Sequence, residues 1–178
     1  QGAFFNEAET AFIKAIEFDS TYIYAYSNLG SLYSSYGFYE SAYQEHERGI
    51  KVSPESAYPD LYRELGNAYQ ALAKLNEATK AYKNAIKADA GYPDAHFGLG
   101  HIHAMYSDYR QAIVEYNKAI SLYSKYTAGF AHMHIKYSNY MRRFMHNLAQ
   151  AKEDLEKDKA QVTALNSGYN KERQKTLG

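Results

Sequence analysis

Residues 62–86 of this 178-residue chain read YRELGNAYQALAKLNEATKAYKNAI. Within this stretch Tyr62, the pair Leu65-Gly66 and Tyr69 recur at i, i+3, i+4 and i+7, which places them on one face of a helix. A second segment with helical spacing follows after a short break. The stretch therefore predicts two helices packed as a hairpin, in which the glycine lets the second helix approach closely.

The same pattern occurs three times, and Leu29, Leu65 and Leu99 mark the copies at intervals of 36 and 34 residues. Each first helix carries an aromatic residue or histidine, a Leu-Gly pair and a second aromatic residue or histidine, and each second helix carries a small alanine. The positions are Tyr26, Leu29-Gly30, Tyr33 and Ala42; Tyr62, Leu65-Gly66, Tyr69 and Ala78; His96, Leu99-Gly100, His103 and Ala112. Tyr82 and Tyr116 add a large contact in the second and third copies.

This pattern resembles the tetratricopeptide repeat family, whose period is about 34 residues. The resemblance covers about residues 1–140, with His96 and His103 in place of the usual aromatic residues. It implies an all-α fold, a right-handed superhelical solenoid of antiparallel helix hairpins, with the first helices lining a concave wall.

We expect a single domain over residues 1–178. Its predicted segments are a half repeat with only a second helix at 1–20, repeats at 23–58, 59–92 and 93–126, a long terminal capping helix or helices at 127–165, and a polar tail at 166–178.

The composition excludes several classes of function. Twenty basic residues balance 20 acidic ones, so no overall field attracts nucleic acid. No run approaches the ~18 apolar residues of a membrane span, and the chain as given shows no signal peptide. Cysteine is absent, which excludes disulfides and thiolate metal sites. The composition does not predict the compartment.

Catalytic and metal motifs are also missing from the sequence. There is no glycine-rich phosphate loop, nucleophile elbow or zincin motif, so we expect no enzyme activity and no cofactor. Histidines gather in the third repeat and beyond, but a metal needs three or four convergent ligands. Since i,i+2 pairs such as His101 and His103 point to different helix faces, we expect no metal.

The resemblance implies that a peptide or a partner's helix binds the concave groove. The residues at the family's groove-facing positions are Tyr24, Ser27, Ser31, Asp60, Arg63, Asn67, Gln70, Phe97, His101, Met105 and Asn139. The leading hypothesis is therefore a non-catalytic protein-interaction scaffold.

A second hypothesis is a structural protein that stacks head-to-tail through its half-repeat ends into oligomers or a filament. The 20 tyrosines bear on this choice, because many lie outside the repeat pattern near hairpin ends. These tyrosines are typical of an interface, where tyrosine is favoured, and they are equally consistent with packing at the junctions between repeats. A third explanation for the unusual ends is that the chain is a fragment of a longer repeat protein.

Overall fold

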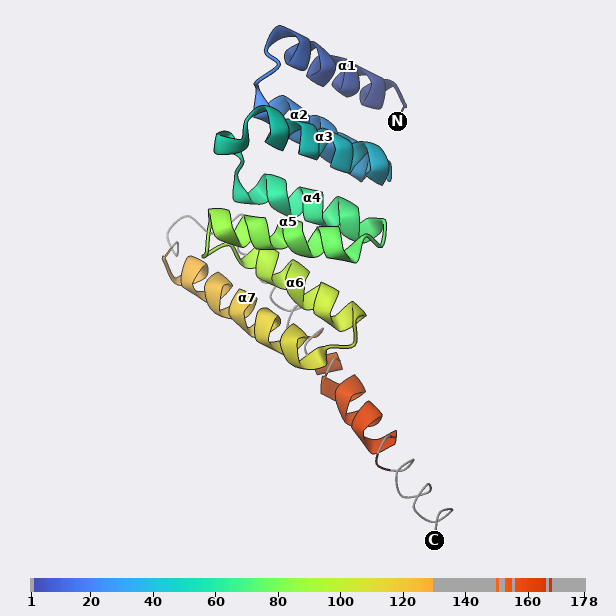
Figure 1. Ribbon diagram of the computed structural model, residues 1–178, viewed down its shortest axis with the longest axis vertical. Helices are drawn as coiled ribbons and strands as arrows, with labels where there is room; N and C mark the ends of the chain where they lie inside the picture. Colours follow the sequence, from blue (N-terminus) through green and yellow to red (C-terminus); the bar gives the residue numbers. More distant parts are fainter. Residues whose placement is uncertain (1, 130–149, 151–152, 155, 166, 168–178) are drawn as a thin grey trace.

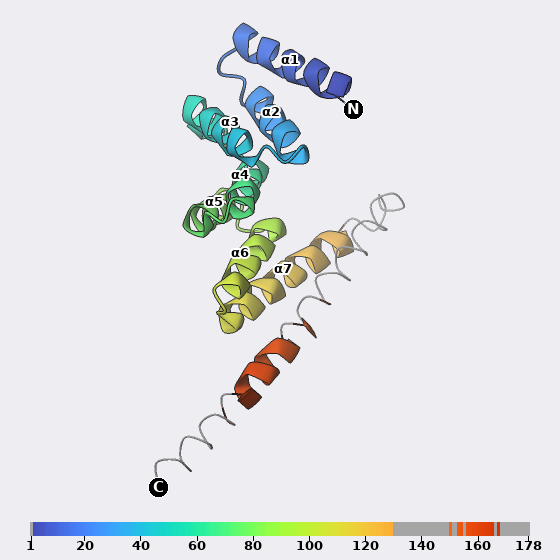
Figure 2. The same cartoon turned by 90° about the vertical axis from the view of Figure 1, so that its right-hand side faces the viewer.

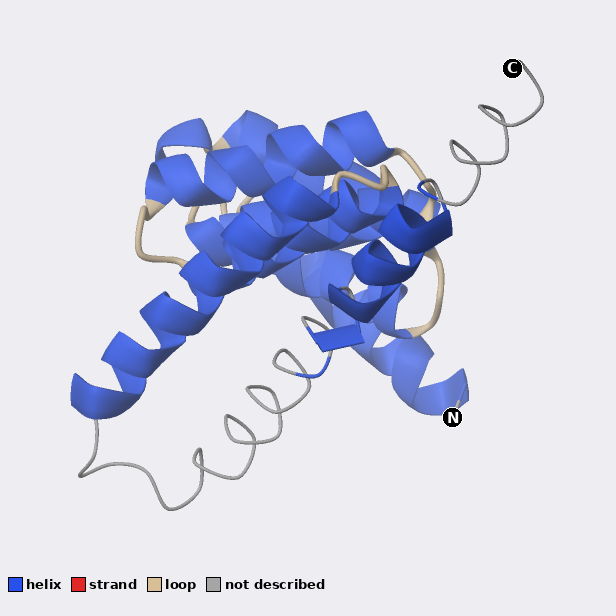
Figure 3. Ribbon diagram, turned by 90° about the horizontal axis from the view of Figure 1, so that it is seen from below, coloured by secondary structure: helices blue, strands red, loops and turns tan. Residues whose placement is uncertain are grey.

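The computed structural model describes residues 2–129 and, beyond them, residues 150, 153–154, 156–165 and 167. Within these residues the regular elements are all helical, and Figure 3 shows helices joined by loops. None of the described helices is both long enough and apolar enough to cross a bilayer.

Seven α-helices and one 3₁₀ turn follow one another through residues 2–129. They are α1 (Gly2–Phe18), α2 (Ile23–Ser35), α3 (Tyr39–Val52), η1 (Pro54–Ser56), α4 (Pro59–Ala71), α5 (Leu75–Ala88), α6 (Pro93–Met105) and α7 (Tyr109–Gly129). Pro59 and Pro93 each occupy the first turn of a helix, where the missing N–H leaves no hydrogen bond unmade.

The pairs α2–α3, α4–α5 and α6–α7 form hairpins that stack along the long axis of the molecule, with α1 packed on α2 (Figure 1). The predicted all-α solenoid of antiparallel helix hairpins is confirmed. The predicted capping helix at 127–165 falls largely outside the described residues, although 156–165 are helical. The predicted tail at 166–178 is outside them except for Ser167.

Each first helix ends in the same turn. Gly37, Ala73 and Ser107 lie in the left-handed region, with φ of 82°, 56° and 60°. In each turn the amide N–H of the following residue donates to a carbonyl five residues earlier, at 2.9 Å. This geometry is the Schellman motif. Only one of the three positions is glycine, so the hairpin packing holds the other two residues in a backbone conformation that costs about 1 kcal/mol.

An aromatic ring from each second helix packs onto the Leu-Gly glycine of its own first helix. A Cβ built on Gly30, Gly66 or Gly100 would lie 2.5–2.6 Å from the ring of His46, Tyr82 or Tyr116 respectively. His46 lies four residues after Ala42, as Tyr82 lies four after Ala78. It therefore occupies the aromatic position of the first repeat, for which the repeat pattern predicts no residue.

Tyr82 also joins two hairpins. Its ring would lie 2.5 Å from a Cβ built on Gly98 of α6, so the ring is held between Gly66 and Gly98. Only 1% of Tyr82 is exposed, and it belongs to the central core together with Leu65 and Leu99.

We predict that Gly30→Ala lowers the free energy of unfolding by about 1–3 kcal/mol, because the added methyl group overlaps the His46 ring. Urea denaturation measures the loss. In a His46→Ala background the same change is neutral or stabilises by up to about 1 kcal/mol, since alanine favours helix over glycine. An equal loss in both backgrounds would contradict the ring contact.

Candidate functional site

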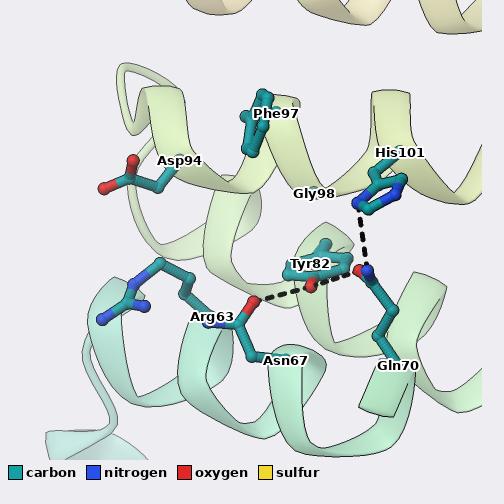
Figure 4. Close-up of a pocket in the computed structure, with 8 residues that line it drawn as sticks. All are labelled: Arg63, Asn67, Gln70, Tyr82, Asp94, Phe97, Gly98 and His101. Carbon is teal, nitrogen blue, oxygen red and sulfur yellow. Dashed lines mark hydrogen bonds between the residues drawn. The ribbon is translucent and has the colours of Figure 1, made fainter. Parts of the chain in front are cut away.

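Two adjoining cavities lie on the face formed by α2, α4 and α6, where α4 contacts both neighbouring first helices. One, of about 320 Å³, lies between α4 and α6 (Figure 4) and is lined by Arg63, Asn67, Gln70, Tyr82, Asp94, Phe97, Gly98 and His101. The other, of about 310 Å³, lies between α2 and α4 and is lined by Ser31, Ser34, Ser35, Arg63, Glu64 and Asn67. Arg63 and Asn67 line both cavities, so we treat the two as one surface, the groove.

The hydroxyl group of Tyr82 orients the amides of the groove. It lies 2.8 Å from Asn67 Oδ1 and 3.0 Å from Gln70 Oε1, so its single proton is shared between two acceptors, and Gln70 Nε2 lies 3.1 Å from His101 Nδ1. Figure 4 shows this chain of bonds running across the cavity from α4 to α6. Because the carbonyl oxygen of Asn67 faces Tyr82, its exposed amide NH₂ is directed away from the hydroxyl and can donate to a partner.

Arg63 is held by two carboxylates of α4 and by Tyr92, which lies just before α6. Its Nη2 lies 2.6 Å from Asp60 and 3.2 Å from Glu64, and its Nε lies 3.0 Å from the Tyr92 hydroxyl. That hydroxyl in turn donates to Asp60 at 2.6 Å. Burial favours the uncharged form of Arg63, but Tyr92, Asp60 and Glu64 outweigh it and raise the pKa of Arg63. The guanidinium is therefore a fixed, permanently charged part of the wall.

Burial also opposes the ionised form of Asp60, but the Tyr92 hydrogen bond and the Arg63 charge prevail and lower the pKa of Asp60. Both members of the Arg63–Asp60 pair are thus charged at neutral pH.

Tyrosine rings border the groove at the start of α2. Tyr24 stacks on Tyr58, with ring centroids 5.2 Å apart, and about half of Tyr24 is exposed. The Tyr58 hydroxyl donates to Ser27 Oγ at 2.8 Å. Ser27 itself is only 5% exposed, so it positions Tyr58 and is not available for direct contact with a partner.

The predicted groove residues fall into distinct environments. Those lining the cavities are Ser31, Arg63, Asn67, Gln70, Phe97 and His101. Asp60 pairs with Arg63 beside them, and Met105 is exposed at the end of α6, outside the lining of either cavity. Asn139 lies outside the described residues.

Sequence reasoning did not assign Glu64, Asp94 or Tyr82 to the groove. Asp94 is the repeat equivalent of Asp60, 34 residues later, and that spacing was the available signal. No comparable signal identifies Tyr82, because its ring is buried and only its hydroxyl reaches the cavity.

The described histidines of the third repeat have separate partners. His96 Nδ1 lies 2.7 Å from Glu115, His103 Nδ1 lies 3.7 Å from Asp108, and His101 meets Gln70. Among the described residues no three histidine, aspartate or glutamate side chains are grouped as metal ligands.

His46 lies directly behind Glu64 of the groove wall. It is fully buried, and neither ring nitrogen has a hydrogen-bond partner among the described residues. Its Nε2 is 3.9 Å from Glu64 Oε2, which is too long for a hydrogen bond. Burial, reinforced by the positive charge of Arg63, lowers the pKa of His46 to about 4. The imidazole is therefore neutral at neutral pH.

Comparison with known proteins agrees with the repeat pattern. The family model described as TPR repeat matches residues 71–105, and the resemblance to the tetratricopeptide repeat family is confirmed. Human protein O-mannosyl-transferase TMTC2 is 33% identical over 96 residues, which is 53% of this chain and 12% of TMTC2. Heat shock protein STI1 of Saccharomyces cerevisiae is 32% identical over 100 residues, or 56% of this chain and 17% of STI1. The chain thus spans less than a fifth of either relative.

Solved structures share the fold. A crystal structure of MamA superposes with a TM-score of 0.63 at 21% identity, covering 90% of this chain and 87% of that one. MamA 41-end from Desulfovibrio magneticus RS-1 gives 0.61 at 22% identity, covering 69% and 68%. The repeat match and the solenoid fold together support a protein-interaction scaffold, a class that is typically non-enzymatic.

We predict that the free energy of unfolding falls as the pH drops from about 6.5 to about 4. His46 titrates near pH 6.5 in an unfolded chain and at about 4 in the folded one. Between these values the unfolded state binds more protons, so stability rises with pH, by about 3 kcal/mol at most. Chemical denaturation at a series of pH values measures this slope. In His46→Phe the free energy of unfolding should depend less steeply on pH, because the contribution of His46 is gone. An unchanged slope in this variant would contradict the assignment of the pH dependence to His46.

Proposed function

We propose that this protein is a non-catalytic scaffold whose groove binds a peptide or a helix of a partner protein. The observation that carries the proposal is the position of Asn67, which lines both cavities and whose carbonyl oxygen faces Tyr82, so that its amide NH₂ is left to donate to a ligand. Ser31, Gln70 and His101 place further polar groups along the same path.

The preorganisation of the groove also supports the proposal. Its amides and its guanidinium are already fixed by hydrogen bonds within the protein, so a ligand does not have to immobilise them. Phe97 and Tyr24 supply partly exposed aromatic surface beside the polar groups, which suits the mixed character of peptide side chains.

We predict that Asn67→Ala weakens a groove-bound peptide by about 3- to 10-fold, the loss that accompanies removal of one hydrogen bond. The probe is a labelled peptide selected on the wild-type protein from a random library, and fluorescence polarisation gives its Kd. Asn84→Ala, at an exposed position of α5, makes the same chemical change away from the groove. Equal affinities for the two variants would remove the groove from the proposal.

A second candidate function, self-association, is favoured by the apolar surface of α1. Phe4 is 70% exposed, Phe18 is 95% exposed and Ile13 is 40% exposed. Phe4 and Phe18 are 14 residues apart and so lie on the same side of α1, where they could form part of an interface, whereas Ile13 lies on the opposite side. In this case the copies would stack through α1.

The second candidate predicts that the mass measured by light scattering after size exclusion grows beyond that of a dimer over a hundredfold range of concentration. Phe18→Ser should then reduce the mass without lowering the midpoint of thermal unfolding, because the side chain is almost fully exposed. A constant mass near 20.3 kDa would exclude this function for the chain as given.

A further inference from the structure

We infer that the groove recognises a basic peptide segment, with one lysine or arginine side chain of the partner directed toward Glu64 and another toward Asp94. The inference rests on the proposed function, because it names the chemistry of the ligand that the groove would take.

The charged residues of the three first helices are mainly acidic. Helices α2, α4 and α6 contain three carboxylates, Asp60, Glu64 and Asp94, against one arginine, Arg63, and no lysine. The lysines between residues 23 and 125 all lie on second helices or in the turn at Lys74. The face that bears the groove is therefore negatively charged, although the whole chain is neutral.

Arg63 does not balance this charge. It lies nearest to Asp60, at 2.6 Å, and farther from Glu64, at 3.2 Å. Burial raises the pKa of Glu64, even though the Ser31 hydroxyl and the Arg63 charge act in the opposite direction. A cation brought into the cavity between α2 and α4 would therefore stabilise the Glu64 carboxylate.

The cavity between α4 and α6 has its own carboxylate. Figure 4 shows Asp94 on α6 and Arg63 on α4 at the same end of this cavity, with Phe97 one helical turn along from Asp94. The Tyr123 hydroxyl donates to Asp94, which fixes the carboxylate at the rim. Phe97 offers an apolar ring to the methylene stem of a lysine or arginine, and such stems pack readily on apolar surface while the charge stays near a partner.

The two carboxylates also set a spacing. They belong to successive first helices, and packed helices lie about 8–10 Å apart. An extended peptide advances about 3.3 Å per residue. The two basic residues of the partner should therefore lie about three positions apart in an extended segment.

Panning a phage-displayed library of random dodecapeptides on the whole chain tests the inference. Peptides that bind Asn67→Ala at least about threefold more weakly than the wild type, but bind Asn84→Ala as tightly as the wild type, are groove ligands. We expect lysine and arginine to be enriched at least threefold in them over the starting library, with pairs about three residues apart. Groove ligands that are acidic or uncharged would overturn the inference and leave the proposed function intact. If no peptide depends on Asn67, both are overturned.

Charge-removing variants then test the two positions on one selected, synthesised peptide. Glu64→Gln and Asp94→Asn should each weaken it by about five- to tenfold, and 0.5 M NaCl should weaken wild-type binding in the same direction. Both replacements are isosteric and keep an oxygen that accepts the hydrogen bond from Ser31 or Tyr123, and urea midpoints check that the fold is retained. Glu77→Gln, an exposed site on α5, removes the same charge away from the groove and should have no effect. An equal effect of Glu77→Gln would show nonspecific attraction and overturn the inference.

Discussion

The rest of the structure depends on an aromatic ring pressed against glycine. Tyr82 lies between Gly66 of its own hairpin and Gly98 of the next one, and a Cβ on either glycine would come within 2.6 Å of the ring. The thickness of one ring therefore sets the distance between α4 and α6. Because these two helices also form the wall of the groove, the same ring sets the spacing of that wall. Ala78 and Ala81, which lie on α5 with Tyr82, are buried in the same cluster.

The same contact links the core to the binding surface. The ring of Tyr82 belongs to the core, while its hydroxyl reaches the cavity and shares its proton between the amide oxygens of Asn67 and Gln70. From the other side, Tyr58 and Tyr92 each precede a first helix and reach back to the previous one, bonding Ser27 and Asp60. Adjacent hairpins are thus tied together at the groove, and the polar groups that a ligand would meet are positioned by repeat packing.

Local spacing made the fold predictable. The Leu-Gly pairs and the aromatic residues around them recur within a few residues of one another, so the sequence displays the helix faces directly. The environment of the groove residues was not predictable in this way, because it depends on contacts between residues about 30 positions apart. Ser27 is buried beneath Tyr58, which lies 31 residues later at the start of α4, and Asp94 is held by Tyr123.

The tyrosines outside the repeat pattern fall into two groups. Tyr58 and Tyr92 pack at the junctions between hairpins, whereas Tyr22 and Tyr106 are about half exposed.

The junction between the first and second repeats differs from the junction between the second and third repeats at two positions that face each other. Where α6 has Gly98, α4 has Glu64, and where α5 has Tyr82, α3 has His46. The six-membered ring of Tyr82 leaves no room for a Cβ opposite it. The smaller imidazole of His46 leaves room for the whole Glu64 side chain, whose carboxylate reaches the groove. A buried histidine without hydrogen bonds lowers the stability of the fold. Its small ring, however, allows a carboxylate to lie in the groove wall. At this junction the smaller core ring is thus accompanied by a negative charge on the groove surface beside it.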